Sequence, residues 1–323
     1  MFKEPAWRFF PLTPAAQTGS LWAMRTYTLD DLRNWPTATR DLSNPARLAV
    51  IGDPVAHSRS PQMHNPALRA AGIDGEYVRL HLQPEELEEG IALMKAADFI
   101  GFNATIPHKG AVFAAVDGMS ETARRIGAVN TVAIRDGVLV GHNTDAPGWK
   151  EAVREAFSAD LAGLRVMVVG AGGGAGRAAA VQCAMDRCER LVLANRTVEK
   201  AHALAAELRD AIGDAGRLAV IPWEEGAMER ELDGIDLIVN ATSMGMKEGD
   251  AEAVPQRLIQ PHHLVYDMVY APARTRLMAA AEERGAKAEN GLGMLLWQGA
   301  LAFEFWFRRE APLVAMREGL LGS

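Results

Sequence analysis

The sequence predicts an α/β protein of two units, each built on a largely parallel sheet, with a cleft between them. Two series of alternating strands and helices indicate these units, one beginning at Ala46 and the other at Arg165. An apolar helix over 292–307 has no strand after it, so it can leave the second unit and return to the first. The predicted division is an N-terminal extension over 1–45, a first unit over 46–147 plus 292–323, and a second unit over 148–291.

The bulk composition narrows the classes of partner. The chain has 323 residues, 49% of them hydrophobic, which is enough for two domains with real cores. Its net charge of -7 does not suit a nucleic-acid binder. No apolar run is long enough to predict a membrane span, and the N-terminus lacks the apolar core of a signal peptide. Cys183 and Cys188 lack the spacing of a redox or zinc site, so we expect a reducing, cytoplasmic setting and free thiols.

The first 45 residues contain Trp7, Trp22 and Trp35, three of the seven tryptophans of the chain. Disordered segments are usually poor in aromatic residues. We therefore expect much of this segment to pack against the folded body or a partner chain. Translation that starts at Met24 is the alternative explanation.

In the first unit the elements follow from apolar runs bounded by turn residues. A helix is predicted from Pro61 to Gly72, because proline suits the first helical position and glycine the residue after the end. A second helix begins at Pro84 and carries acidic residues in its first turn. Asp136-Gly137 predicts a hairpin. The predicted strands are 47–52, 76–82, 98–106, 128–134 and 138–142.

In the second unit helices fall between most of the strands, so a parallel sheet is expected there. We expect the boundary between the units near 146–150, at Ala146-Pro147-Gly148. The predicted strands are 165–170, 190–195, 218–221, 236–241, 264–269 and 286–289.

A glycine-rich loop follows the first strand of the second unit and opens a helix. Gly170, Gly172 and Ala175 match the G-x-G-x-x-[GA] pattern of a dinucleotide site, and Gly173 and Gly174 lie between them. The first glycine permits a tight turn, the second lets the backbone approach a pyrophosphate, and the small third residue lets helix and strand pack closely. The N-terminus of the following helix then offers free N–H groups and a partial positive charge to the phosphates of the dinucleotide. A plain glycine-rich turn is the alternative.

The next strand ends in Asn195-Arg196-Thr197, where an NAD enzyme usually places an acid on the ribose. Arg196 supplies a cation and Thr197 a hydroxyl, which suits a 2′-phosphate and predicts NADP as the cofactor. Lys200 is either a second cation for that phosphate or a solvated helix lysine.

Polar residues gather at the predicted strand ends of the first unit. Ser58 and Ser60 lie before a helix, where they can bind a carboxylate, although Ser60 can equally cap that helix. Asn103 and Thr105 share one face of a strand, which suits a hydroxylated ring. Lys109 follows at the start of the next helix. The further clusters are Ala128-Val129-Asn130-Thr131 and Asn143-Thr144-Asp145.

Together these motifs resemble the shikimate dehydrogenase family, from about Ala46 to the C-terminus. In the family's order the chain has H-S-x-S-P, N-x-T-x-P-x-K, G-A-V-N-T, N-T-D, G-A-G-G, N-R-T, N-A-T-S, Y-D-M-x-Y and G-L-G-M-L-x-x-Q. The resemblance implies a substrate-binding domain, a Rossmann-type NADP-binding domain, and the NADPH-dependent reduction of 3-dehydroshikimate to shikimate on the route to aromatic amino acids. Ala146 and Asn290 depart from the family's usual Gly and Asp.

The resemblance also implies roles for the matching positions. Lys109 and Asp145 are the catalytic pair, and Ser58 and Ser60 hold the substrate carboxylate. Tyr266 is preferred to Tyr270 as a further substrate contact. The implied contacts of the ring hydroxyls are Asn103, Thr105, Asn130 and Gln298. The implied nicotinamide side of the cofactor site comprises Asn240, Thr242, Met244, Met268, Gly291 and Met294.

Other assignments stay open beside this one. A quinate/shikimate dehydrogenase is the nearest alternative, and serine at both Ser58 and Ser60 favours the shikimate type. A non-catalytic NADP-binding sensor on the same fold is the alternative of a different class, and the presence of Lys109 and Asp145 argues against it. No histidine pattern predicts a metal site, so none is expected. The expected partner is a small molecule, and the chain is expected to be a monomer or homodimer.

Overall fold

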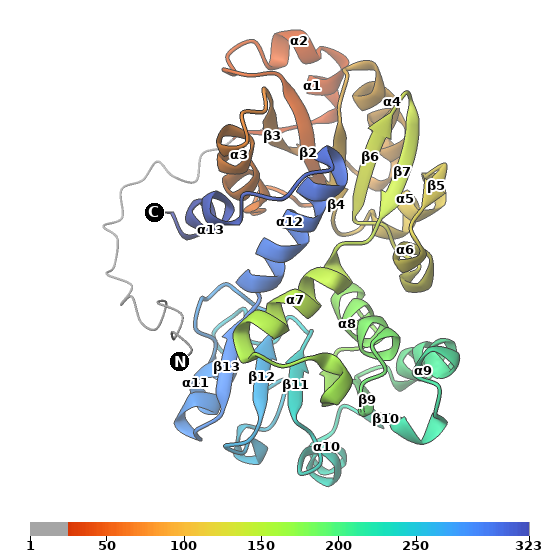
Figure 1. Cartoon of the computed structure of the whole chain (residues 1–323), viewed down its shortest axis with the longest axis vertical. Helices are drawn as coiled ribbons and strands as arrows, with labels where there is room; N and C mark the ends of the chain where they lie inside the picture. The colour runs from red at the N-terminus through yellow and green to blue at the C-terminus, as the bar shows by residue number, and fades with distance from the viewer. Residues whose placement is uncertain (1–24, 323) are drawn as a thin grey trace.

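The computed structural model describes residues 25–322, which form two α/β units joined by long helices (Figure 1). The first sheet has seven strands in the order β1-β3-β2-β4-β6-β7-β5. It is mixed, because β6 pairs antiparallel with both β4 and β7. Its strands are β1 (Thr26–Tyr27), β2 (Ala46–Gly52), β3 (Glu76–His81), β4 (Gly101–Ala104), β5 (Gly118–Met119), β6 (Thr131–Arg135) and β7 (Val138–His142).

Helices cover both faces of the first sheet. Alternate strand residues face opposite sides, so Ala49 and Ile51 of β2 pack with one helical layer and Leu48 and Val50 with the other. The first layer contains α1 (Leu29–Arg33), α2 (Trp35–Ala38), α4 (Leu87–Ala96), α5 (Lys109–Ala115) and α6 (Glu121–Ile126). The second layer contains α3 (Ser60–Ala70), α12 (Leu292–Phe307) and α13 (Leu313–Leu321).

The second sheet is parallel throughout, in the order β10-β9-β8-β11-β12-β13. This is the doubly wound order of dinucleotide-binding domains, whose ligands bind where the strand order reverses, here between β8 and β11. The strands are β8 (Arg165–Val169), β9 (Arg190–Asn195), β10 (Leu218–Pro222), β11 (Leu237–Asn240), β12 (Leu264–Asp267) and β13 (Lys287–Asn290). The covering helices are α7 (Asp145–Phe157), α8 (Gly174–Met185) and α9 (Val198–Ile212) on one face, with α10 (Glu225–Leu232) and α11 (Arg276–Glu283) on the other.

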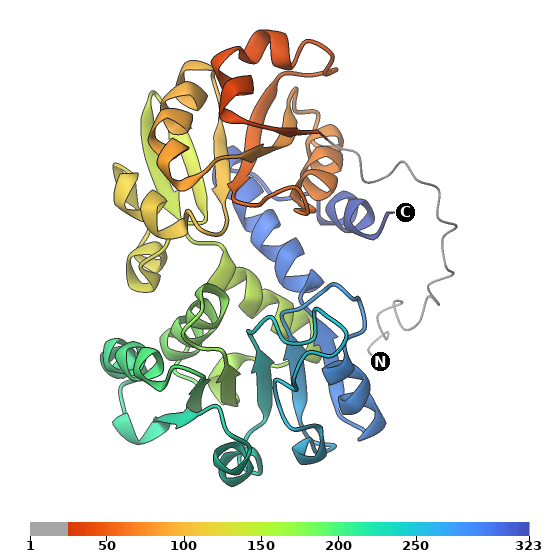
Figure 2. The same ribbon diagram turned by 180° about the vertical axis from the view of Figure 1, so that it is seen from behind.

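Two long helices, α7 and α12, pack together where the two units meet, as both views show (Figures 1 and 2). The residues Ala146-Pro147-Gly148, where we expected the boundary between the units, form the first turns of α7, which packs in the core of the second unit. Proline is tolerated there since the first N–H groups of a helix have no partner within it. Gly148 is needed for the close approach, because a Cβ at this position would lie 2.6 Å from the Gln298 nitrogen of α12.

The described part of the N-terminal extension is part of the first unit: it adds one strand to the sheet and two helices to the first helical layer. β1 pairs in parallel with β3, and Trp35 is buried between Tyr27 and Phe99, with ring centroids 5.0 and 5.4 Å away. Arg33 donates to both carboxylate oxygens of Glu89, and these exposed hydrogen bonds hold α1 against α4. The expected packing is confirmed for Trp35, whereas Trp7 and Trp22 lie outside the described residues.

Candidate active site

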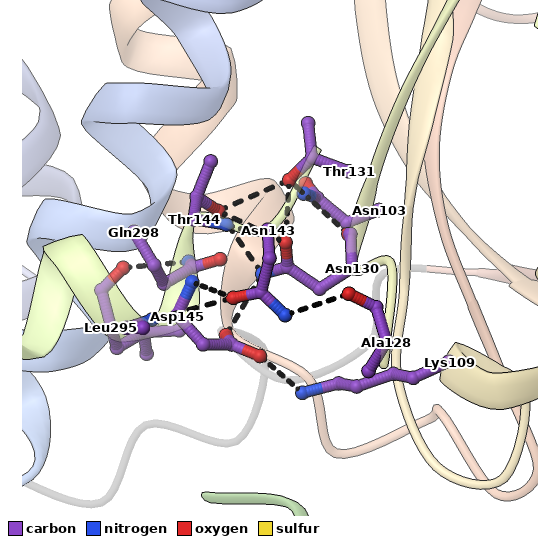
Figure 3. Close-up of polar contacts among 11 residues, drawn as sticks. Asn103, Lys109, Ala128, Asn130, Thr131, Asn143, Thr144, Asp145, Leu295 and Gln298 are labelled. Atoms are coloured by element: carbon purple, nitrogen blue, oxygen red, sulfur yellow. Dashed lines mark hydrogen bonds and ion pairs between the residues drawn. The ribbon is translucent and has the colours of Figure 1, made fainter. Parts of the chain in front are cut away.

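Lys109 and Asp145 meet where α5 and α7 begin (Figure 3). Lys109 is the first residue of α5 and Asp145 the first of α7. The Lys109 Nζ lies 2.6 Å from Asp145 Oδ2, and their side chains keep 26% and 12% of their surface exposed. The pair is therefore shielded but reachable, as a proton-handling group has to be.

Asp145 is fixed from every side. Its Oδ1 accepts a hydrogen bond from Asn130 Nδ2 at 2.8 Å, and its backbone N–H donates to Asn143 Oδ1 at 3.1 Å (Figure 3). Asn143 in turn donates to the Ala128 carbonyl at 3.0 Å. The N-terminus of α7 adds a partial positive charge that stabilises the carboxylate. Asp145 is thus a preorganised anion that orients the Lys109 ammonium.

The amides of Asn103 and Asn130 have little donor capacity left. Asn103 Nδ2 donates to Asn130 O and Thr131 Oγ1, and Asn130 Nδ2 donates to Thr144 Oγ1 and Asp145 Oδ1. Each NH₂ group has two hydrogens, so both are used. The amide oxygen of Asn130 already accepts from the Thr131 hydroxyl at 3.0 Å and the Thr144 N–H at 2.8 Å, so both of its lone pairs are used. The amide oxygen of Asn103 accepts one hydrogen bond, from the Tyr77 hydroxyl, and keeps a lone pair for a ring hydroxyl.

The two serines form a pair of adjacent hydroxyls. Ser58 Oγ donates to Ser60 Oγ at 3.2 Å, and the Ser60 N–H donates to Ser58 Oγ at 3.3 Å. Ser60 is the first residue of α3. Tyr77, which the sequence analysis missed, links this pair to Asn103, one of the expected contacts of the ring hydroxyls. Its hydroxyl donates to Asn103 Oδ1 at 2.7 Å, while burial raises its pKa and a hydrogen bond with Ser60 opposes that rise.

Three other expected substrate contacts lie in different surroundings. Thr105 is half-buried just beyond β4, and Gln298 is buried on α12, where its Nε2 donates to Leu295 O at 2.8 Å. Tyr266 is fully buried in the core of the second unit, and its hydroxyl accepts from the Met294 N–H at 3.0 Å. The preference for Tyr266 over Tyr270 is therefore corrected, because only Tyr270 retains exposed surface.

The glycine loop has the predicted turn but a different closest contact. Gly170 has a positive φ of 86°, and a Cβ on Gly172 would lie 2.9 Å from Asn195 Nδ2. The contact expected at Ala175 falls instead on Gly176, where a Cβ would meet Gly170 O at 2.3 Å. Gly176 is thus the small residue that lets α8 pack on β8, and Ala175 is only half-buried. Gly173 is the N-cap residue of α8 and Gly174 its first residue.

A hollow of about 290 Å³ lies over the point where the strand order reverses. Arg196 and Lys200 are exposed on its wall, and neither pairs with a carboxylate among residues 25–322. Asn195 braces the hollow, since its Oδ1 accepts from the Gly172 N–H and its Nδ2 donates to Thr197 O. Trp223 follows β10 and also lines it, a contact that the sequence analysis missed although β10 lies beside β9. The remaining lining comprises Gly170, Gly172, Gly173, Thr197, Ala241, Thr242, Ser243 and Met244.

The loop after β11 reaches this hollow, but Asn240 does not. Asn240 is fully buried, and its amide donates to Asp267 Oδ1 and Met244 O while its oxygen accepts from Thr242. The expectation that Asn240 lies along the cofactor is therefore corrected: it shapes the loop that presents Thr242 and Met244. Burial raises the pKa of Asp267, the carboxyl group beneath the loop.

Gly291, Met268 and Met294 lie together at the start of α12. A Cβ on Gly291 would lie 2.2 Å from Met268 O, so the chain can pass only with glycine there. Met268 and Met294 are half-buried. Asn290 replaces the family's usual Asp and still serves the helix, since its Oδ1 accepts from the Leu292 N–H at 2.9 Å.

Within residues 25–322, no three His, Cys, Asp or Glu side chains come together as a metal site would require. The same part of the chain holds no helix of the length and apolarity that a membrane crossing needs. Cys183 and Cys188 are both buried and free.

Comparison with known proteins identifies the family to which this site belongs. Residues 50–132 match the shikimate dehydrogenase substrate-binding domain, residues 151–262 the shikimate / quinate 5-dehydrogenase model, and residues 291–321 the shikimate 5'-dehydrogenase C-terminal domain. A shikimate dehydrogenase (NADP(+)) of Methanopyrus kandleri is 42% identical over 276 residues, 85% of this chain and 94% of the relative. The chain belongs to the shikimate dehydrogenase family.

Solved structures of shikimate dehydrogenases share the fold. A shikimate 5-dehydrogenase from Thermus thermophilus, in complex with NADP(H) and shikimate, has a TM-score of 0.76 at 38% identity and covers 86% of this chain and 99% of its own. A quinate dehydrogenase from Corynebacterium glutamicum, in complex with NAD, has a TM-score of 0.77 at 30% identity and covers 87% and 100%. The fold alone therefore does not separate shikimate from quinate, and the side chains have to.

Proposed function

We propose that this protein catalyses the reversible, NADPH-dependent reduction of 3-dehydroshikimate to shikimate. The observation that carries the proposal is the Lys109–Asp145 pair, with 2.6 Å between Nζ and Oδ2 where α5 and α7 begin. The names and bound ligands of the relatives agree with it. We assign the first unit to the substrate and the second to the cofactor, in a cytoplasmic enzyme that is a monomer or homodimer.

Lys109 has the proton-donating role in this mechanism. When bound, NADPH supplies the hydride for the ketone carbon, which leaves negative charge on the oxygen. Asp145 has both oxygens engaged by donors, so it is suited to remain an anion. The Lys109 ammonium has hydrogens beyond the one that it donates to Asp145, so it can stabilise the forming alkoxide and protonate it.

The second unit fits NADP because it offers both phosphate sites. Gly170, Gly172 and Gly173 line the hollow beside the N-terminus of α8, where free N–H groups favour a pyrophosphate. Arg196 and Lys200 lie on the same wall without a carboxylate partner in the described part of the chain, so their charges are available to a ribose phosphate.

Ser58 and Ser60 favour shikimate over quinate. The two hydroxyls are 3.2 Å apart and hydrogen-bond to each other, which is compact enough for one carboxylate. Quinate carries a hydroxyl on the same carbon as its carboxylate and so needs more room there. The quinate dehydrogenase among the structural neighbours keeps quinate as the second candidate substrate.

Steady-state turnover of shikimate and quinate, each with NADP and with NAD, tests the proposal. We expect shikimate with NADP to have the highest kcat/KM. Comparable kcat/KM for quinate would overturn the substrate assignment, and comparable values for NAD would overturn the cofactor assignment. Binding of NADP with no turnover of either acid would instead indicate a non-catalytic sensor.

A further inference from the structure

A buried arginine contacts the backbone of the loop that carries the two serines. Arg79 is on β3 and only 2% of its surface is exposed. Its Nε donates to the backbone carbonyl of Ser58 at 2.8 Å. Neither the sequence motifs nor the resemblance singled out this residue, because its neighbours on β3 look like an ordinary buried strand.

Arg79 holds the serine loop at two points. The direct contact fixes the Ser58 carbonyl. The second runs through Gln62. In the amide orientation that satisfies both groups, its oxygen accepts from Arg79 Nη2 at 2.9 Å and its nitrogen donates to the Arg59 carbonyl at 3.1 Å. The backbone carbonyls of two consecutive residues, Ser58 and Arg59, are thereby held by one guanidinium on the first sheet, the first directly and the second through Gln62.

The positive charge of Arg79 suits a site where a carboxylate binds to the two serine hydroxyls. Burial lowers the pKa of its guanidinium from the ordinary value of 12.5, because desolvation disfavours the charged form. A carboxylate bound to the serine hydroxyls would be attracted by this positive charge, whereas the hydroxyls themselves bring no charge. Lys109 is already paired with Asp145, and Arg59 directs its guanidinium to the Leu320 carbonyl of α13.

We propose that Arg79 is a positioning residue for the substrate, which fixes the serine loop from behind and supplies the counter-charge for the substrate's carboxylate. The inference rests on the proposed function, since it assumes that Ser58 and Ser60 bind that carboxylate. It predicts that the enzyme's preference for an acid over its neutral amide depends on residue 79. The effect would be electrostatic, because Arg79 contacts the backbone of the serine loop and is buried.

The test compares shikimate with its carboxamide, which keeps the ring and its hydroxyls but has no charge. Arg79→Gln keeps a hydrogen-bond donor and removes the charge, whereas Arg79→Lys keeps the charge. We expect Arg79→Gln to raise KM for shikimate about tenfold or more, with kcat and the KM for NADP within about twofold of native. Its kcat/KM for the carboxamide should change less than about threefold, and Arg79→Lys should keep most of the preference for the acid.

Arg135→Gln is the matched control, because Arg135 also donates to a backbone carbonyl, that of Phe305 at 2.9 Å, from the far end of β6. Equal losses for the acid and the amide in Arg79→Gln would overturn the proposal, since a loop support without a charge effect gives that result. If Arg79→Gln does not fold, Arg79→Lys decides, and a folded lysine variant without preference for the acid also overturns it. A native enzyme that fails to turn over shikimate contradicts the proposed function instead.

Discussion

The substrate side and the cofactor side of this protein are built on opposite plans. On the substrate side the polar groups are buried and bonded to one another: Asn103, Asn130 and Asp145 are 5%, 2% and 8% exposed. On the cofactor side Arg196 and Lys200 are exposed and have no carboxylate partner within residues 25–322. One region is organised before its ligand arrives, and the other presents unpaired charge.

The difference follows from what each region has to do. Proton delivery to one oxygen requires donors fixed in place, and buried, mutually bonded amides provide that without reorganisation during the reaction. Binding of a phosphate requires attraction and tolerance, which exposed cations on flexible stems provide. We therefore expect substitutions in the bonded network around Lys109 and Asp145 to change the rate of chemistry, and those on the cofactor side to change the affinity for NADP.

Lys109→Met should have the largest effect. The substitution keeps an apolar stem but removes the charge and the donor, and a positioned acid typically contributes about 10²–10⁴-fold to the rate. We expect kcat to fall by that order, measured by steady-state turnover of shikimate, while the Kd for NADP changes little. Near-normal turnover would remove Lys109 from the chemistry.

Asp145→Asn sharpens the same comparison, because it removes the anion that orients Lys109 and keeps the shape of the side chain. If the two residues act as a unit, the double variant should be little slower than the slower single variant. Two effects that multiply would show that they act separately and would weaken the account of a preorganised pair.

Arg196→Ala tests the cofactor side. Loss of a charge-assisted hydrogen bond to a 2′-phosphate should raise KM for NADP by about 10- to 100-fold and leave KM for NAD nearly unchanged. Arg217 is exposed just before β10 begins, at the opposite end of the parallel strands from Arg196, and gives the control Arg217→Ala. Equal effects of Arg196→Ala on NADP and NAD would place the phosphate elsewhere.

Ser58→Ala should raise KM for shikimate about tenfold, because one hydrogen bond to the carboxylate is lost. The Kd for NADP should stay within about twofold, since the serine loop belongs to the first unit. Ser120→Ala is the control, because Ser120 caps α6 and should affect stability alone. An unchanged KM in Ser58→Ala would assign the carboxylate to other groups.

Gly148→Ala tests the contact between α7 and α12, where the substrate side and the cofactor side of the protein meet. A Cβ there would lie 2.6 Å from the Gln298 nitrogen, so backbone has to move, and overpacking of this kind costs about 1–3 kcal/mol. Gly226→Ala in α10, where the nearest atom would be 3.9 Å away, should be neutral or stabilising by up to about 1 kcal/mol. The free energy of unfolding from urea titrations measures both. Equal stability of the two variants would contradict the close approach.

Much of the arrangement could be predicted from the sequence, because its signals are local. The helix over 292–307 was predicted with the observed bounds, and the strand at 190–195 likewise. Glycine loops and helix caps depend on residues close together in the chain, so their motifs carry their geometry.

The errors concern contacts that only the folded structure reveals. Only packing reveals that Gly176 faces Gly170 O, that Asn240 is sealed beneath its loop, and that the Tyr266 hydroxyl is occupied by Met294. Gly148 is a similar case, because only the structure shows that it lies against the Gln298 nitrogen of α12.

Lys200→Ala should have the smallest effect, and it decides between the two interpretations that the sequence left open. Lys200 is exposed on α9 and lines the hollow, but its stem also lies against the glycine loop, where a Cβ on Gly172 would meet Lys200 Cβ at 3.0 Å. If its charge assists the phosphate, KM for NADP should rise about two- to fivefold, in line with one exposed and screened ion pair. That rise should shrink as salt increases, because exposed pairs are screened. Lys287→Ala, on the opposite edge of the sheet, should leave KM unchanged at every salt concentration. A rise for NADP that does not depend on salt, or one equal for NAD, would show that Lys200 only supports the loop, and the cofactor side would then rely on Arg196 for its charge.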